Sequence, residues 1–335
     1  DGAVHLSYNG EVYNYGELRR ELTALGHHFR TASDTEVILE GYKRWDMGVL
    51  GRLRGMFALA LWDTRTRRFI LARDRLGQKP LYYTRQQGVL LVASEIKGLL
   101  AWPSIERTPK LAAINQYLSF QYVPTPDTAF EGIYMLPPAT AMIVESGGAT
   151  ETTCYWSLPH PVAAKKRSIT DLEEELRHRL DEAVEMRLTS DVSIGAFLSG
   201  GIDSASVVAS MARVSDSPVK TFTIGFDEPS FDERRYARMV SERYGTEHHE
   251  MVVRPDAVDI LPKLIWLYGQ PFADSSAVPT YYLAEFTRRH VTVALTGDGG
   301  DENFLGYPRY AGAMLGGCVD AIPKPLRRML GALGR

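Results

Sequence analysis

The stretch FLSGGIDSAS, residues 197–206, decides the fold of the second half of the chain. The apolar, partly β-branched segment before it, DVSIGAFL, predicts a buried strand that ends near Leu198. The segment after it places Val207, Val208 and Met211 on one helical face, which predicts a helix beginning near Ser204. A glycine-rich turn between a strand and a helix directs backbone N–H groups and the positive end of the helix dipole outward. Such a turn is suited to bind phosphate oxygens.

Strands and helices alternate around this stretch. This alternation predicts a parallel sheet with helices on both faces, in which ligands bind at the carboxyl ends of the strands. Three of the predicted strand ends carry unusual residues, in SGGIDS, GFDE and TGDGGDE. Besides the strand before Ser199 and the helix after it, the predicted helices are 170–188, 232–245, 257–269 and 278–289, and the predicted strands are 219–226 and 291–297.

A second acidic cluster, LTGDGGDEN at residues 295–303, places Asp298, Asp301 and Glu302 together. Carboxylates beside a phosphate site would repel the ligand unless a hard cation lay between them, and Mg²⁺ with oxygen ligands is the natural candidate. The alternatives are a glycine-rich turn with a polar helix cap at 199–204 and a solvated loop at 295–303. Neither a GxxxxGK[ST] loop nor a GxSxG elbow is present.

The first half of the chain has a different pattern of predicted secondary structure. Short β-like runs at 4–14, 56–63, 68–74, 80–84 and 88–94 are separated by turn residues. Only two helical patterns, at 15–22 and 34–45, interrupt them. This pattern predicts an α+β domain with stacked antiparallel sheets. We therefore predict one domain over residues 1–157, a linker over 158–168, and a second domain over 169–335.

Composition limits the function classes. The 335 residues are 44% apolar and 24% charged, with a net charge of −3, which gives no electrostatic case for a nucleic-acid partner or an anionic membrane surface. No apolar run is long enough for a transmembrane helix. The two cysteines, Cys154 and Cys318, form neither a disulfide framework nor a CxxC motif, so a cytoplasmic setting is expected.

The motifs of both halves resemble one family. SGGIDS is similar to the pyrophosphate-loop signature of ATP pyrophosphatases, and TGDGGDE…GY is similar to the downstream loop of glutamine-dependent asparagine synthetases. YNGEVYN, ASDTEVIL, GMFALALWD, ARDRLGQKPLYY and ASEIKGLL resemble the glutaminase domain of the same enzymes. The matches run in order from about residue 4 to residue 310. The chain is thus identified as resembling the asparagine synthetase B type, a class II amidotransferase.

The resemblance implies an N-terminal-nucleophile glutaminase-like domain followed by an α/β ATP pyrophosphatase domain with ATP and Mg²⁺ as cofactors. It implies that Asp298 takes part in forming an acyl-adenylate, and that Asp203 and Asp301 hold Mg²⁺. The residues implied to bind ATP are Phe197, Ser199, Gly200, Gly201, Asp203, Ser204, Ile224, Thr296 and Gly297.

In the first half, the resemblance implies that Asn9 and Gly10 build an oxyanion hole and that Glu11 and Asp34 hold the glutamine amine. Taken alone, YNGEVYN is also typical of a strand ending in an Asn-Gly turn. The family's nucleophile is an N-terminal cysteine, expected upstream of this motif, whereas residue 1 is Asp. We therefore expect a chain truncated at both ends, whose glutaminase half is not competent as given.

The expected function is ATP-dependent amide formation on a carboxylate with glutamine-derived ammonia. Aspartate is the leading acceptor, although residues 271–287 lack the Arg that the family links to it, which leaves Asp274, Ser275 and Ser276 as candidates. The alternatives are an amidating or ring-closing ligase acting on another acid, and an inactive ATP-binding scaffold. A homodimer is a further expectation.

Overall fold

The computed structural model describes residues 2–159, 167–229, 232–254 and 257–320. By its internal contacts the chain divides into two compact units: Asp1–Ser168 with Pro255–Thr280, and Ile169–Arg254 with Tyr281–Arg335. Residues 255–280 therefore group with the first half of the chain, which the pattern of the sequence does not indicate. The predicted domain limits stay a prediction, and residues 160–166 of the predicted linker lie outside the described residues.

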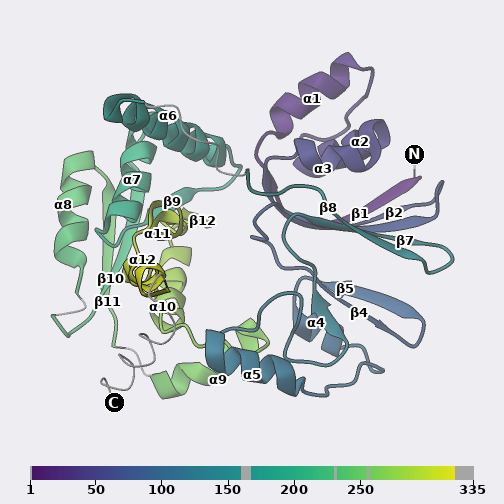
Figure 1. Ribbon diagram of the computed structural model, residues 1–335. Coiled ribbons are helices and arrows are strands. Elements are labelled where there is room, and N and C mark those ends of the chain that lie inside the picture. The colour runs from purple at the N-terminus through teal and green to yellow at the C-terminus, as the bar shows by residue number, and fades with distance from the viewer. Residues whose placement is uncertain (1, 160–166, 230–231, 255–256, 321–335) are drawn as a thin grey trace. The chain divides into compact units, whose positions relative to one another are not determined.

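The first unit is built on a five-stranded antiparallel sheet (Figure 1). Its order is β1 (Val4–Val12), β2 (Gly55–Asp63), β3 (Arg68–Arg73), β7 (Thr140–Glu145) and β8 (Thr150–Cys154). One face is covered by α1 (Tyr15–Ala24), α2 (Asp34–Trp45) and α3 (Val49–Arg52), with the short 3₁₀ turn Asp46–Gly48 between the last two. The largest core cluster of this unit lies between the sheet and these helices, because alternate strand residues such as Val12, Phe57 and Ile70 face them.

A second antiparallel sheet stacks on the other face of the first. Its order is β5 (Val89–Ala93), β4 (Tyr82–Gln86) and β6 (Ile133–Met135). Ala58, Leu71 and Met142 of the large sheet pack against Leu81 and Leu136 around the small one. This confirms the predicted sandwich of antiparallel sheets.

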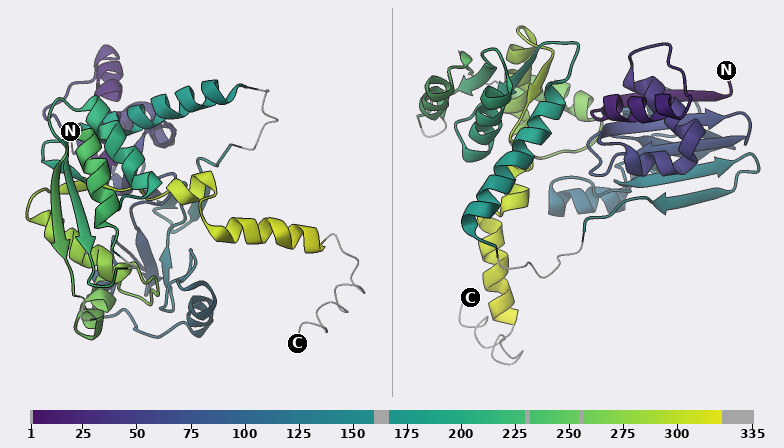
Figure 2. Two further views of the ribbon diagram at one scale, coloured as in Figure 1. Left: turned by 90° about the vertical axis from the view of Figure 1, so that its left-hand side faces the viewer. Right: turned by 90° about the horizontal axis from the view of Figure 1, so that it is seen from above.

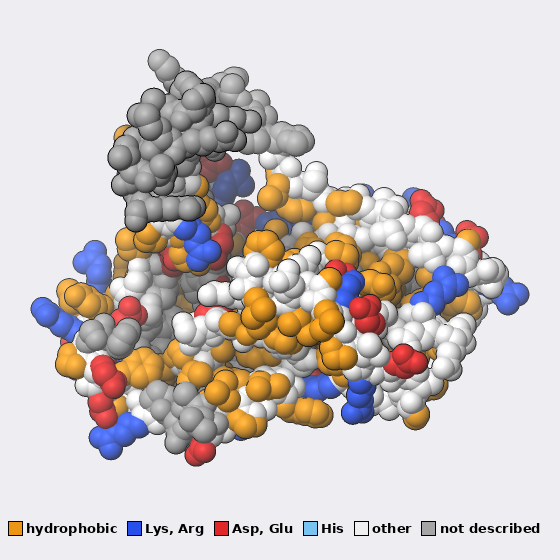
Figure 3. All heavy atoms as spheres, turned by 60° about the horizontal axis from the view of Figure 1, so that its bottom comes forward, with side chains coloured by type: hydrophobic (Ala, Val, Ile, Leu, Met, Phe, Trp, Pro, Cys, Tyr) orange, Lys and Arg blue, Asp and Glu red, His pale blue; other side chains and the backbone are white. Residues whose placement is uncertain are grey.

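Three more helices belong to the first unit: α4 (Ile96–Leu100), α5 (Leu111–Phe120) and α9 (Ala257–Tyr268). Hydrophobic side chains gather on the face of the molecule shown in Figure 3. Trp266 of α9 is 65% exposed and lies beneath the Lys97 ammonium. The exposed large hydrophobic residues of α5 and α9 are Leu111, Leu118, Phe120, Leu261, Ile265, Trp266, Leu267 and Tyr268.

The second unit holds a four-stranded sheet in the order β11 (Glu247–Val252), β10 (Lys220–Gly225), β9 (Ile194–Phe197) and β12 (Val293–Leu295). All three neighbouring pairs are parallel. From β9 the chain proceeds through β10 to β11 on one side, and β12 then pairs with the opposite side of β9. The strand order therefore reverses between β9 and β12, and such a switch point is where open α/β sheets bind ligands.

Helices cover both faces of this parallel sheet, as predicted. On one face, α6 (Ile169–Leu188), α7 (Ile202–Val214) and α8 (Arg234–Tyr244) form a core with Ala196 and Leu198 (Figure 2). On the other, Phe286 of α10 (Ala277–Arg288) packs edge-on against the fully buried Phe222, at 6.1 Å between ring centroids. The remaining helices are α11 (Gly300–Phe304) and α12 (Pro308–Asp320). No helix within the described part of the chain is long and apolar enough to cross a bilayer.

Candidate functional sites in the two units

Gly10 lies in β1, the edge strand of the large sheet, opposite Phe57 of β2. The N–H and C=O of Phe57 both bond to Asp74, on the side of β3, at 3.1 and 2.8 Å. Gly10 and Phe57 therefore form a pair without mutual hydrogen bonds, and the Gly10 N–H points to the outer edge of β1. A Cβ at Gly10 would lie 2.1 Å from the Met56 carbonyl oxygen, so the close approach of β2 requires glycine here. The geometry leaves one strand-edge N–H directed outward at the predicted oxyanion position.

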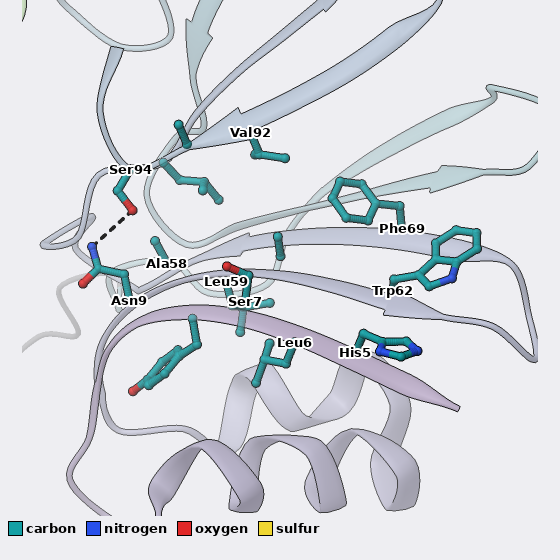
Figure 4. Close-up of a pocket in the computed structure, with 14 residues that line it drawn as sticks. His5, Leu6, Ser7, Asn9, Ala58, Leu59, Trp62, Phe69, Val92 and Ser94 are labelled. Carbon is teal, nitrogen blue, oxygen red and sulfur yellow. Dashed lines mark hydrogen bonds between the residues drawn. The ribbon is translucent and has the colours of Figure 1, made fainter. Parts of the chain in front are cut away.

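The Asn9 side chain lies on the other side of the strand from the helices. Its Nδ2 donates to Ser94 Oγ at 3.2 Å, across the gap between the two sheets. Both residues line a cavity of about 470 Å³ between the sheets. Figure 4 shows Asn9 and Ser94 at one end of this cavity and His5, Trp62 and Phe69 at the other. Glu11, two residues along β1, shares the strand face of Asn9.

Asp34 is the first residue of α2 and contacts the same edge of β1. Its Oδ2 accepts hydrogen bonds from the Val12 N–H at 2.9 Å and from the Tyr8 hydroxyl at 2.7 Å. Because Val12 and Gly10 are two residues apart on one strand edge, the N–H groups of these residues lie about 7 Å apart. The structure thus brings all four predicted glutamine-binding residues, Asn9, Gly10, Glu11 and Asp34, to one end of β1.

The loop after β9 is held in shape by two serine hydroxyls. Ser199 Oγ accepts from the Gly201 N–H at 3.2 Å, and Ser204 Oγ accepts from the Ser199 N–H at 3.2 Å. Gly200 has φ +83°, and a Cβ there would lie 2.4 Å from the Cβ of Tyr236, so both the backbone and α8 require glycine. The helix after the loop begins at Ile202, slightly before the predicted start. Its first-turn N–H groups, from Ile202 to Ser204, lack intrahelical acceptors.

The two loops beside the switch point pack directly against each other. A Cβ at Gly297 would lie 2.7 Å from the Ser204 nitrogen, and one at Gly300 would lie 2.1 Å from Asp203 Cγ. The Asp203 carboxylate therefore rests on the backbone of Gly300, next to Asp301. The carboxylate of Asp301 itself turns against Gly306. The convergence of these loops is the main geometric feature of the second unit.

The other predicted ATP-site residues surround this convergence. Phe197 ends β9, and Ile224 lies near the end of the neighbouring β10. Thr296 and Asp298 follow β12, and Thr296 Oγ1 donates to Asp298 Oδ2 at 2.8 Å. The ends of β9, β10 and β12 thus lie on the carboxyl edge of the sheet, where parallel α/β sheets bind ligands.

Tyr307 is linked to the acidic loop through Glu302. The hydrogen bond to Glu302 raises the pKa of the Tyr307 hydroxyl to about 12.

The chemistry of these side chains fits a hard divalent cation. Asp203 and Asp301 offer carboxylate oxygens, the donors that Mg²⁺ prefers, and Mg²⁺ commonly uses one or two carboxylates together with substrate phosphates. Within the described residues, His, Cys, Asp and Glu side chains do not form a cluster of three or more that could hold a metal by itself. Asp203 and Asp301 could supply two of the oxygen ligands of a metal whose other ligands are phosphate oxygens.

Sequence reasoning missed three residues that belong to these sites. Tyr8 and Ser94 contact Asp34 and Asn9, respectively. Arg234 lies at the end of β10, where a Cβ on Gly225 would meet its Nε at 2.1 Å, and its guanidinium pairs with Asp232 at 2.7 Å. The tyrosine before the NGE motif and the two arginines of FDERR stand out in the sequence, but no sequence pattern indicates which residues they contact.

Comparison with known families agrees with the two units. The family model for a glutamine amidotransferase domain matches residues 1–156, and the model for asparagine synthase matches residues 175–332. The first half of the chain therefore matches a glutamine amidotransferase domain, and the second half matches an asparagine synthase domain.

Individual relatives narrow the class. The chain is 37% identical over 98% of its length to asparagine synthetase [glutamine-hydrolyzing] 1 of Bacillus subtilis, and 38% identical over 98% to a putative asparagine synthetase of Mycobacterium bovis. It covers 52% of each of these proteins, and so spans about half their length. It is also 34% identical over 92% of its length to Amidase chry2 of Gibberella zeae, of which it covers 48%. The chain is therefore similar to asparagine synthetases over almost its whole length, as the motifs indicate.

Proposed function

We propose that the full-length protein is an ATP-dependent amidotransferase, a carbon–nitrogen ligase of the glutamine-hydrolysing asparagine synthetase type. It would activate a substrate carboxylate, with aspartate as the leading candidate, as an acyl-adenylate with release of pyrophosphate. Ammonia from glutamine would then displace AMP to form the amide. The observation that carries this proposal is the packing of the Gly297–Gly300 loop on Asp203 and Ser204 at the switch point of the sheet.

The residues of the second unit take separate roles in this proposal. The backbone N–H groups of Gly200 and of the first turn of α7 bind the pyrophosphate oxygens, since these donors have no intrahelical acceptor. Phe197, Ile224, Thr296 and Gly297 border the nucleotide at the strand ends. Asp203 and Asp301 would hold Mg²⁺, which supplies positive charge that stabilises the departing pyrophosphate. Asp298, oriented by Thr296, assists formation of the acyl-adenylate.

The residues of the first unit bind and polarise glutamine. Asn9 Nδ2 and the outward Gly10 N–H donate to the oxygen of the tetrahedral intermediate, whose negative charge they stabilise. Glu11 and Asp34 hold the α-amine of glutamine. The family nucleophile is a cysteine thiolate, which attacks the amide carbon; ammonia then leaves with a proton, and water hydrolyses the thioester.

The experiment is acid-dependent exchange of labelled pyrophosphate into ATP by the full-length protein with Mg²⁺, across a panel of carboxylic acids led by aspartate. This assay requires neither glutamine nor its hydrolysis. Exchange with aspartate supports asparagine synthesis. Exchange with a different acid, and none with aspartate, indicates that the protein amidates that acid. If protein that binds ATP gives no pyrophosphate exchange with any acid, the ligase function is contradicted and an ATP-binding scaffold is favoured.

A second candidate is amidation of an acid other than aspartate. Residues 271–287 carry no Arg, so a second substrate carboxylate would lack a guanidinium partner from this segment. One relative with 34% identity is named an amidase, not an asparagine synthetase. Under this candidate, aspartate gives no exchange and a different carboxylate does.

A further inference from the structure

The hydroxyl of Tyr8 contacts the carboxylate that the proposed function assigns to the glutamine amine. It donates to Asp34 Oδ2 at 2.7 Å, and the Val12 N–H donates to the same oxygen at 2.9 Å. Among the described residues, Oδ1 accepts longer bonds, from the hydroxyls of Ser33 at 3.4 Å and Thr35 at 3.3 Å. Two short hydrogen bonds thus hold one oxygen of Asp34, and the other oxygen has weaker local partners that a ligand can replace.

Tyr8 is well placed to fix a carboxylate. Its ring packs against the core cluster between β1 and the helices, together with Leu6 and Tyr15. Burial, with the hydrogen bond to Asp34, raises the pKa of the Tyr8 hydroxyl well above its ordinary value. The raised pKa favours the protonated hydroxyl, which is a hydrogen-bond donor. The ring is partly buried, and its packing against the core restricts its rotamers and so the position of its hydroxyl oxygen.

We propose that Tyr8 is a positioning residue for glutamine: its hydroxyl, together with the Val12 N–H, fixes Asp34 so that Oδ1 is presented to the α-amine of the substrate. The inference rests on the proposed glutamine site. Without the hydroxyl, one of the two short bonds to Oδ2 is lost and the carboxylate can rotate about its side-chain torsions. The α-amine then pairs with a carboxylate that is less often in the binding orientation, so glutamine binds more weakly while the oxyanion donors at Asn9 and Gly10 are untouched.

The test is steady-state glutamine hydrolysis by full-length Tyr8→Phe, Asp34→Asn and the double variant. Tyr8→Phe is expected to raise KM for glutamine about tenfold with kcat within about twofold, because a hydrogen bond to a charged group is lost from the binding site alone. Asp34→Asn is expected to raise KM further. Because Tyr8 acts through Asp34, the double variant is expected to match Asp34→Asn.

The chain offers a matched control in Tyr42→Phe. The Tyr42 hydroxyl donates to Asp63 Oδ2 at 3.2 Å in the same core, away from β1 residues 8–12. This substitution also removes one Tyr–Asp hydrogen bond, and KM for glutamine is expected to stay at its normal value. Thermal unfolding of all four variants reports their structural cost.

The outcomes separate this inference from the function on which it rests. A normal KM in Tyr8→Phe beside a raised KM in Asp34→Asn overturns the role of Tyr8 and leaves the glutamine site standing. Additive effects in the double variant also overturn it, because Tyr8 would then act independently of Asp34. A normal KM in Asp34→Asn overturns the assignment of Asp34 in the proposed function itself.

Discussion

The two candidate sites are held in place by different means. In the first unit, side-chain hydrogen bonds fix the predicted residues, as in Tyr8–Asp34 and Asn9–Ser94, along one edge of an antiparallel sheet. In the second unit, the predicted residues sit on glycine-containing loops that pack closely together: Gly297 meets the backbone of Asp203 and Ser204, and Gly300 meets the Asp203 carboxylate. The first site is a set of side chains oriented by hydrogen bonds, and the second is a pair of glycine loops packed around Asp203.

This difference determines how each site should respond to substitutions. Removing a side chain at the strand edge deletes one donor or acceptor and leaves the sheet intact. Adding even one methyl group to the glycine loops displaces the groups packed against them, because closely packed atoms leave no free space.

The largest expected effect is at Asp203. Asp203→Asn removes a proposed metal-holding charge at the first turn of α7, and pyrophosphate exchange is expected to fall about 10³-fold without a change in the circular dichroism spectrum. Asp216→Asn, an exposed aspartate just after the same helix, is the control and should retain full exchange. Normal exchange by Asp203→Asn would remove the metal assignment.

At the strand edge, Asn9→Ala is expected to lower kcat for glutamine hydrolysis about 10²-fold, because one oxyanion donor is lost. Asn14 of the same YNGEVYN motif is the control. Its amide bonds to the Arg52 carbonyl at 3.0 Å and the Arg54 N–H at 2.8 Å, so Asn14→Ala should cost about 1–2 kcal/mol of stability with normal glutamine kinetics. Equal kinetic losses in both variants would contradict the role of Asn9.

Gly300→Ala tests the cradle without removing any charge. Its Cβ would overlap Asp203 Cγ, and displacing a positioned group by about 1 Å can cost on the order of 10²-fold in rate. Gly312→Ala, whose Cβ would meet open space on α12, should leave pyrophosphate exchange unchanged. If Gly300→Ala exchanges normally, the close packing of the two loops is not what positions Asp203.

The smallest effect concerns stability. The Arg65 hydrogen bonds hold the pKa of the buried Asp63 carboxyl well below its usual range. A depressed folded-state pKa means that the stabilisation is fully present above the unfolded pKa of about 4, declines as pH falls below that value, and is lost as pH falls through the folded-state pKa. Asp63→Asn should therefore cost about 1.5–3 kcal/mol at pH 7 and clearly less at pH 2. Denaturant unfolding at both pH values measures this, and an equal cost at both would contradict it.

Much of the fold was predictable because its signals are local. Alternating apolar residues predict β1 to β5, and periodic ones predict α6 to α10. Strand β11 was missed because Glu247–Val252, EHHEMV, reads as a charged segment. It becomes a strand only through parallel pairing with β10, which is a tertiary effect.

The candidate sites were predictable where turn chemistry marks them. The glycines and serines of SGGIDS indicate a phosphate-binding loop without knowledge of the fold. The Tyr8–Asp34 contact was not predictable, because the two residues are 26 positions apart and meet only when α2 packs on β1. The turn of the Asp301 carboxylate toward Gly306 depends on the path of a loop, which composition does not specify.

The most direct test of the account measures both products in the same variants of the full-length protein. Glutamate from glutamine, and AMP formed with ammonia and whichever acid supports pyrophosphate exchange, are assayed in Asn9→Ala and Asp203→Asn. We expect Asn9→Ala to lose glutamate and keep AMP, and Asp203→Asn to lose AMP and keep glutamate. If either folded variant loses both products or keeps both, the assignment of separate chemistry to the two units is contradicted.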